Sequence, residues 1–165
     1  QYRTQHYQPL SLYRYRRGRA GDEISYEFPV GMNIRLPSGG AVIGVGLDII
    51  EVDRVEGAFN RHGDRFLKRI FTTEERDYCF SMKKPFPHLA ARFAAKEAVS
   101  KSFTTGIGRH LRWTSVSIYN KSRGQPLVRL DEKGLDLLRK VGATDVLVTL
   151  SHTRIYANAV AVLVR

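Results

Sequence analysis

The sequence has little cysteine, no long apolar run and a deficit of acidic residues. Cys79 is the single cysteine among 165 residues, which excludes an internal disulfide framework and a zinc site built from several cysteines. No apolar run reaches the roughly 18 residues of a membrane-spanning helix, and the N-terminus lacks the apolar core of a secretory signal. We therefore expect a cytoplasmic protein without membrane insertion.

Acidic residues are outnumbered by basic ones. The chain has 27 Lys and Arg against 16 Asp and Glu, a formal net charge of +11. Such a charge favours an anionic partner: nucleic acid, a phosphorylated cofactor, an acidic protein or an anionic membrane. The charge alone does not choose among them.

Composition changes near residue 40. Residues 1–40 are rich in Tyr and Arg, end in the turn-prone segment 36–40, and show no sustained period of 2 or 3.6. We interpret them as an N-terminal extension outside the core. Residues 41–165 then form one domain, because 42% hydrophobic residues suffice for a single core at this length.

The regular part predicts an α+β fold with an antiparallel sheet packed on a long central helix. In the first strand, we expect Val45, Leu47 and their alternate neighbours to face the core, and the face with Gly44, Gly46 and Asp48 to be nearly bare. Pro85 and other turn residues separate the later elements. The expected strands cover 41–50, 113–119, 127–130, 145–151 and 156–163, and the expected helices 53–60, 88–103, and those starting after Thr72 and Asp131.

The long helix carries alanines at a helical spacing that favours close packing on a sheet. Glu97 and Lys101 lie one turn apart at the edge of this face, where a plain solvated ion pair is the alternative to a functional role. Arg92 and Lys96 fall on the side that we expect to be exposed, as solvated charges or anion contacts.

Asp48 and Glu97 are candidate ligands of a hard cation. Magnesium prefers one or two carboxylates and completes its shell with water and phosphate oxygens. Asp48 also fits a simple cap of the next helix. The loop from Gly106 to Arg109 could offer backbone N–H groups to a phosphate or merely end the helix, and His152 is either a hairpin hydrogen-bonder or a ligand contact.

Four segments together resemble the holo-[acyl-carrier-protein] synthase family of 4'-phosphopantetheinyl transferases. GVGLDIIEVDR (44–54) resembles the family's first motif, and RFAAKEAVSKSF (92–103) its second. GIG (106–108) follows at the family's spacing, and TLSHTRIYANAVAV (149–162) is similar to its closing hairpin. The resemblance covers about residues 44–165.

The resemblance implies the phosphopantetheinyl transferase fold and an enzyme that moves phosphopantetheine from coenzyme A to a serine of an apo acyl carrier protein, with Mg2+, releasing 3',5'-ADP. It implies Asp48, Glu97 and Lys101 as catalytic residues, the two carboxylates being metal ligands, and a homotrimer with sites between subunits. The implied coenzyme A contacts are Arg92, Lys101, Gly106, Ile107, Gly108, Arg109, Ser151 and His152. The implied carrier-protein contacts are Arg54, Arg61 and Arg65.

Two other functions compete with this interpretation. A basic nucleic-acid-binding module agrees with the charge and with the Tyr and Arg of residues 2–19, but leaves Asp48 and Glu97 unexplained. We therefore expect no nucleic-acid partner. A carrier-protein-binding domain without catalysis is disfavoured because Asp48, Glu97 and Lys101 are all present.

Overall fold

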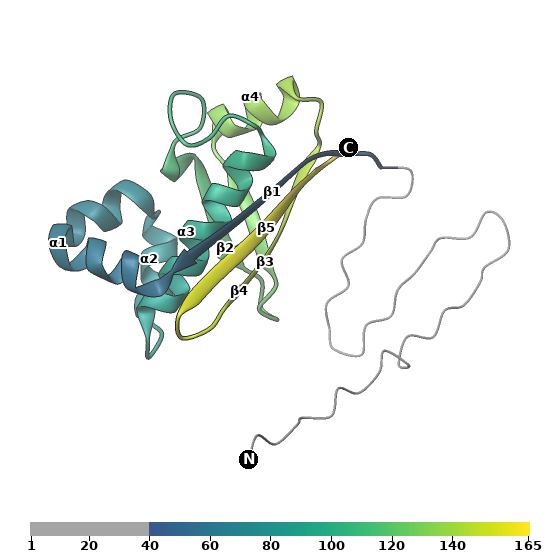
Figure 1. Ribbon diagram of the computed structural model, residues 1–165. Helices are drawn as coiled ribbons and strands as arrows, with labels where there is room; N and C mark the ends of the chain where they lie inside the picture. The colour runs from purple at the N-terminus through teal and green to yellow at the C-terminus, as the bar shows by residue number, and fades with distance from the viewer. Residues whose placement is uncertain (1–39) are drawn as a thin grey trace, which may run out of the picture. The chain divides into compact units, whose positions relative to one another are not determined.

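Residues 40–165 are the part of the chain that the structure, a computed structural model, describes. The predicted extension, residues 1–40, lies outside this range except for its last residue, and the boundary at 41 stays a prediction. The described elements (Figure 1) are, in order, β1 (Val42–Glu51), α1 (Val52–Ile70), α2 (Thr73–Phe80), α3 (Pro85–Ser102), a 3-10 turn (Trp113–Ser115), β2 (Val116–Asn120), β3 (Pro126–Leu130), α4 (Glu132–Lys140), β4 (Asp145–His152) and β5 (Tyr156–Val164).

Two antiparallel sheets surround the central helix. The first has the strand order β1-β5-β4, and the second is the β2–β3 hairpin. Helix α3 packs across all three strands of the first sheet and contacts α1, α2 and β2 on its other sides. The predicted α+β fold with an antiparallel sheet on a long helix is confirmed. Among the helices of residues 40–165, none combines the length and apolar character that crossing a membrane requires.

Helix α3 begins earlier than predicted. Pro85 and Pro87, expected to break the chain, form the first turn of the helix, where proline is tolerated because its missing N–H would have no partner within the helix. The predicted alanine face is confirmed, because the side chains at 90, 91, 94, 95 and 98 are fully buried. This face is the centre of the core.

The two faces of β1 are the reverse of what the sequence predicts. Val45, Leu47 and Ile49, expected in the core, are 62%, 59% and 58% exposed. The glycine face packs on α3 instead, since glycine alone lets a helix of alanines come this close to a strand. Residue size, not hydrophobicity, determined which face is covered.

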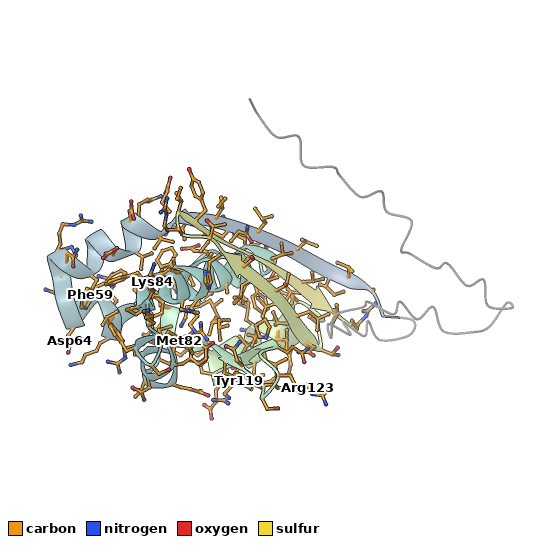
Figure 2. All side chains as sticks on the ribbon, turned by 90° about the horizontal axis from the view of Figure 1, so that it is seen from below. Phe59, Asp64, Met82, Lys84, Tyr119 and Arg123 are labelled. Carbon is orange, nitrogen blue, oxygen red and sulfur yellow. The ribbon has the colours of Figure 1, made fainter. Side chains whose placement is uncertain are left out.

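Two local signals set the course of the chain between β1 and α3. The helix predicted to end near Gly63 instead continues to Ile70 across a kink, where Gly63 has φ 52° and ψ −137°, a conformation that disfavours any side chain. Figure 2 labels Phe59 and Asp64, which lie on either side of this kink. The predicted start of α2 is confirmed by a capping box, in which Thr72 and Glu75 satisfy each other's backbone N–H groups.

Lys96 was expected on the exposed side of α3, and this prediction is wrong because the side chain is fully buried. Its ammonium is 2.8 Å from the Glu75 carboxylate, and both side chains are 0% exposed. Lys96 also donates to the carbonyl oxygens of Trp113 and Val116, at 2.8 and 2.6 Å. Glu75 accepts a hydrogen bond from the Ile118 N–H at 2.9 Å. The pair thus joins α2, α3 and β2, and its satisfied hydrogen bonds are what allow both charges to be buried.

We predict that Lys96→Ala lowers the free energy of unfolding by about 3 to 5 kcal/mol, because Glu75 is left buried without its counter-charge. Lys68→Ala is the matched control, since the Lys68–Asp64 pair is exposed and is worth about 1 kcal/mol or less. Chemical denaturation of both variants measures the difference. Equal effects for the two variants would show that the buried pair contributes no more than a surface pair.

Candidate active site

Strand β1 and helix α3 meet with their backbones in contact. A Cβ atom added to Gly46 would lie 2.0 Å from the carbonyl oxygen of Ala98, and one added to Gly44 would lie 2.3 Å from that of Ser102. Both distances are far below van der Waals contact. No residue but glycine fits at these positions, and Asp48, two residues further along the same face, is consequently held close to α3.

Asp48 is the acidic residue that this contact brings against the helix. Its carboxylate accepts a hydrogen bond from Lys101 Nζ at 2.7 Å, and Lys101 also donates to the carbonyl oxygen of Leu47 at 3.0 Å. The Asp48 side chain is 15% exposed and that of Lys101 is 49% exposed. Asp48 therefore faces a cationic group at the solvent edge of the β1–α3 interface.

Glu97 lies beside this pair, one turn before Lys101 on α3. Partial burial, followed by the nearby Asp48 charge, raises the pKa of Glu97 above its ordinary value, although Lys101 and a hydrogen bond from Ser100 act in the opposite direction. The sequence predicted that Asp48, Glu97 and Lys101 form one cluster, and the structure brings the three together. Lys101 bonds to Asp48, so the simple Glu97–Lys101 surface pair does not describe its geometry.

The predicted phosphate loop, from Gly106 to Arg109, follows α3 at the surface. The left-handed residue that directly follows the helix end is Thr104, with φ 59°, and Gly106 adopts a second positive φ, 64°, within the loop. Arg109 is exposed, as are Gly106 and Gly108, and Ile107 is half-buried. The Gly108 N–H already donates to the carbonyl oxygen of Leu111 at 2.8 Å, so the loop has fewer free backbone donors than its sequence indicates.

A second group of polar side chains gathers at the N-terminal end of α3. His152, at the end of β4, is exposed, as is its neighbour Ser151, and its ring centroid lies 4.7 Å from that of His88 on α3. Arg92, predicted to be exposed, is 2% exposed. Its guanidinium lies 4.1 Å above the Tyr78 ring and donates to Asn120 Oδ1 at 2.6 Å, because the β2–β3 hairpin covers this side of the helix.

Sequence reasoning missed His88, Tyr78 and Asn120 as members of this group. His88 precedes Arg92 by one helical turn, so the helical spacing that located Glu97 beside Lys101 also indicated that His88 and Arg92 share a side. Asn120 and Tyr78 carry no comparable local signal, since tertiary packing alone brings them to Arg92.

The three arginines assigned to the carrier protein, Arg54, Arg61 and Arg65, are all exposed on α1. Arg54 is 3.6 Å from the Glu51 carboxylate, in a pair that is itself well exposed. Cys79, by contrast, is buried, and burial raises the pKa of its thiol to about 11. It is protonated at neutral pH and is not a candidate nucleophile.

The donor set at the site fits magnesium better than a transition metal. Within residues 40–165, no three His, Cys, Asp or Glu side chains gather as a metal cluster. Magnesium needs no such cluster, because one or two carboxylates with water and substrate phosphate are sufficient. Asp48, which already accepts from an ammonium group, and the adjacent Glu97 match that requirement.

Comparison with known proteins identifies the class of enzyme that the sequence motifs resemble. A family model described as the 4'-phosphopantetheinyl transferase superfamily matches residues 44–154. The holo-[acyl-carrier-protein] synthase of Chlamydia trachomatis is 51% identical over 121 residues, 73% of this chain and 98% of the relative. The crystal structure of the Neisseria meningitidis synthase has a TM-score of 0.70 at 29% identity, covering 74% of this chain and 98% of that one. The Helicobacter pylori synthase in complex with coenzyme A has a TM-score of 0.65 at 28% identity, covering 72% and 98%.

We predict that Glu97→Gln makes the metal-free protein more stable above neutral pH. Below the pKa of the unfolded chain, Glu97 is protonated in both states. As the pH rises through the higher folded-state pKa, the folded state must carry an unfavourable charge and stability is lost. With a chelator present, the melting temperature of the variant should exceed that of the native protein near pH 8 and approach it below about pH 4, the ordinary pKa range of glutamate.

Glu132→Gln, which removes an exposed carboxylate from α4, is the control and should give no gain at either pH. A Glu97→Gln variant that is less stable than the native protein near pH 8 would show that the Glu97 charge is stabilised by its surroundings.

Proposed function

The chain belongs to the 4'-phosphopantetheinyl transferase superfamily, and we propose that Asp48, Glu97 and Lys101 form its catalytic centre. Its activity is that of a holo-[acyl-carrier-protein] synthase: it transfers 4'-phosphopantetheine from coenzyme A to an apo acyl carrier protein. The proposal rests on one observation, the contact of Gly46 with α3 that brings the three side chains together.

Glu97 acts as the general base for the acceptor serine. The serine hydroxyl must lose its proton as its oxygen attacks the β-phosphorus of coenzyme A, and the bond from phosphorus to the departing 3',5'-ADP oxygen breaks. A carboxylate with a raised pKa is a stronger base than an ordinary glutamate. The raised pKa of Glu97 therefore suits this proton transfer.

Lys101 stabilises the leaving group. Its ammonium is half-exposed and bonded to Asp48 and to the backbone of Leu47, so one of its three protons remains for an incoming phosphate oxygen. Charge accumulates on the diphosphate as 3',5'-ADP departs, and a cation fixed in advance at that point lowers the barrier.

Asp48 and Glu97 would hold the magnesium ion that the family resemblance implies. When bound, Mg2+ supplies positive charge to the diphosphate oxygens. The two carboxylates repel each other when they are close together. A bound cation would offset this repulsion, which explains why the two lie side by side.

Coenzyme A is bound by two groups of residues in this proposal. The loop from Gly106 to Arg109 lies just beyond Lys101 in the chain, and Arg109 offers an exposed guanidinium. Ser151 and His152 are exposed at the end of β4. Arg92 belongs to the second group, but it is buried. Its role in this proposal is therefore to fix the backbone at His88 and to add positive charge near the substrate without touching it.

The acidic carrier protein docks on α1. Arg54, Arg61 and Arg65 are exposed there, and oppositely charged surfaces accelerate and orient the encounter of two proteins.

Location in the cytoplasm stays a prediction from the sequence.

The complete site lies between subunits of a homotrimer. Glu97 and Lys101 face β1, whereas Arg92 and His88 contact β2 and β4. Because β1 and β4 are the two outer strands of the first sheet, the two groups lie on opposite sides of α3. In the trimer, the group with Glu97 and Lys101 from one subunit and the group with Arg92 and His88 from another would bind the same substrate molecule.

The outer face of the first sheet supports this assembly. Val45, Leu47 and Ile49 point away from α3 and are more than half exposed. In register beside them on β5 lie Val160 and Val162. In Figure 2 side chains on this face project away from the helices, and no helix of the described residues covers them. A continuous apolar face of this kind indicates a protein interface.

We predict that Glu97→Gln lowers the transfer rate at least about a hundredfold, because it removes both the base and a charged ligand. Asp48→Asn should act in the same way, and both should weaken the magnesium dependence. Lys101→Ala should slow transfer while leaving magnesium affinity largely unchanged, since it is not a ligand. Mass spectrometry of apo carrier protein incubated with coenzyme A and a magnesium series measures all three.

Glu132→Gln serves as the control for loss of a carboxylate and should transfer at the native rate. A Glu97→Gln enzyme with near-native rate and metal response would overturn the catalytic assignment.

We predict that Leu47→Asp breaks the trimer and abolishes transfer together, because a buried charge in an apolar interface is strongly unfavourable. Leu135→Asp is the control, since Leu135 is a similarly exposed leucine on α4, at 41%, and should change neither property. Light scattering after gel filtration measures the mass. If Leu47→Asp kept the native mass, the outer face of the sheet would not be the subunit interface.

A further inference from the structure

The ring of His88 is in contact with the ring of His152. Their centroids are 4.7 Å apart and the planes are inclined by 72°, an edge-to-face arrangement. His88 is half-buried near the start of α3, and His152 is exposed at the end of β4. Of the two rings, His152 is thus the one open to a ligand, and His88 is the surface on which it rests.

His88 is itself fixed by its neighbours. The Tyr78 ring of α2 contacts it edge-on with centroids 6.1 Å apart. The His88 carbonyl oxygen accepts a hydrogen bond from Arg92 at 3.4 Å, and Arg92 is in turn bonded to Asn120 on β2. Tyr78 of α2 therefore contacts the ring that supports His152, and Arg92 fixes the backbone that carries this ring.

The group contains basic side chains and no acidic partner for His88 among the described residues. The titratable or charged groups around His88 are Tyr78 from α2, His152 from β4 and Arg92 on α3 itself, and Asn120 from β2 is uncharged. Burial, then His152 and Arg92, lowers the pKa of His88 below its ordinary value. The His88 ring is consequently neutral near pH 7 and can contact the His152 ring as an aromatic group.

We propose that His88 is a positioning residue for coenzyme A binding: it holds the His152 ring in the orientation that receives a phosphate group of the substrate. This inference rests on the proposed contact of His152 with coenzyme A. The edge-to-face contact removes rotational freedom from an exposed side chain before the substrate arrives, so that less freedom is lost on binding.

A double-mutant cycle tests the coupling. Isothermal titration with coenzyme A gives the dissociation constant for the native protein, His88→Ala, His152→Ala and the double variant. His88→Ala should raise this constant on the order of threefold to tenfold, the range for loss of one aromatic contact. In the His152→Ala background the same change should have no further effect, because the supported ring is absent.

His88→Phe keeps a ring at this position and should restore most of the affinity, whereas His88→Gln should behave as His88→Ala does. The melting temperature of each variant identifies any that fails to fold, and His88→Gln replaces His88→Ala in the cycle in that case. His62→Ala is the control, because His62 is exposed on α1 and coenzyme A affinity should not change.

The remaining outcomes are also distinguishable. If His152→Ala weakens binding but the two histidine changes are additive, the proposed function stands and the role of His88 is wrong. If His152→Ala binds coenzyme A as the native protein does, the assignment of His152 fails, and the inference fails with it.

Discussion

The contact between Gly46 and the carbonyl oxygen of Ala98 is the constraint on which the proposed catalytic cluster depends. A methyl group at Gly46 would lie 2.0 Å from that oxygen, so any side chain would force β1 and α3 apart. Asp48 and Glu97 belong to different elements, and the separation of those elements sets the distance between the two carboxylates. A small-residue interface is therefore a functional feature here, because it fixes the spacing of groups that repel each other.

Helix α3 carries a buried ion pair on one side and the proposed catalytic residues on the other. Lys96 is fully buried against Glu75 and has its hydrogen-bonding capacity satisfied by two carbonyl oxygens and the carboxylate. Glu97, the next residue, lies at the solvent edge with a raised pKa. Neighbouring residues on a helix point about 100° apart, which lets one charge anchor the helix while the next stays available for chemistry. The unfavourable charge of Glu97 is tolerated because the anchoring pair and the alanine core already fix the helix.

The sequence predicted the parts of the structure that depend on local pattern. The capping box at Thr72, the alanine face of α3 and the meeting of Asp48 with Glu97 all follow from spacing or motif. The failures share a different cause. Arg92 and Lys96 look solvated on a helical wheel, but the β2–β3 hairpin and α2 cover that side: Asn120 accepts a hydrogen bond from Arg92, and Glu75 pairs with Lys96. The faces of β1 were reversed because an apolar face exposed in one subunit has the same pattern as a face buried in a core.

That exposed face and the division of polar groups across α3 have a common explanation. A single sheet with one helical layer buries only one of its faces, so Val45, Leu47 and Ile49 need a partner outside the described chain. Glu97 and His152 lie on opposite sides of α3, and in the homotrimer that we propose they would reach one substrate from two subunits. Packing of the exposed apolar faces would hold that assembly together. Catalysis would then depend on the packing of an apolar surface that contributes no reactive group.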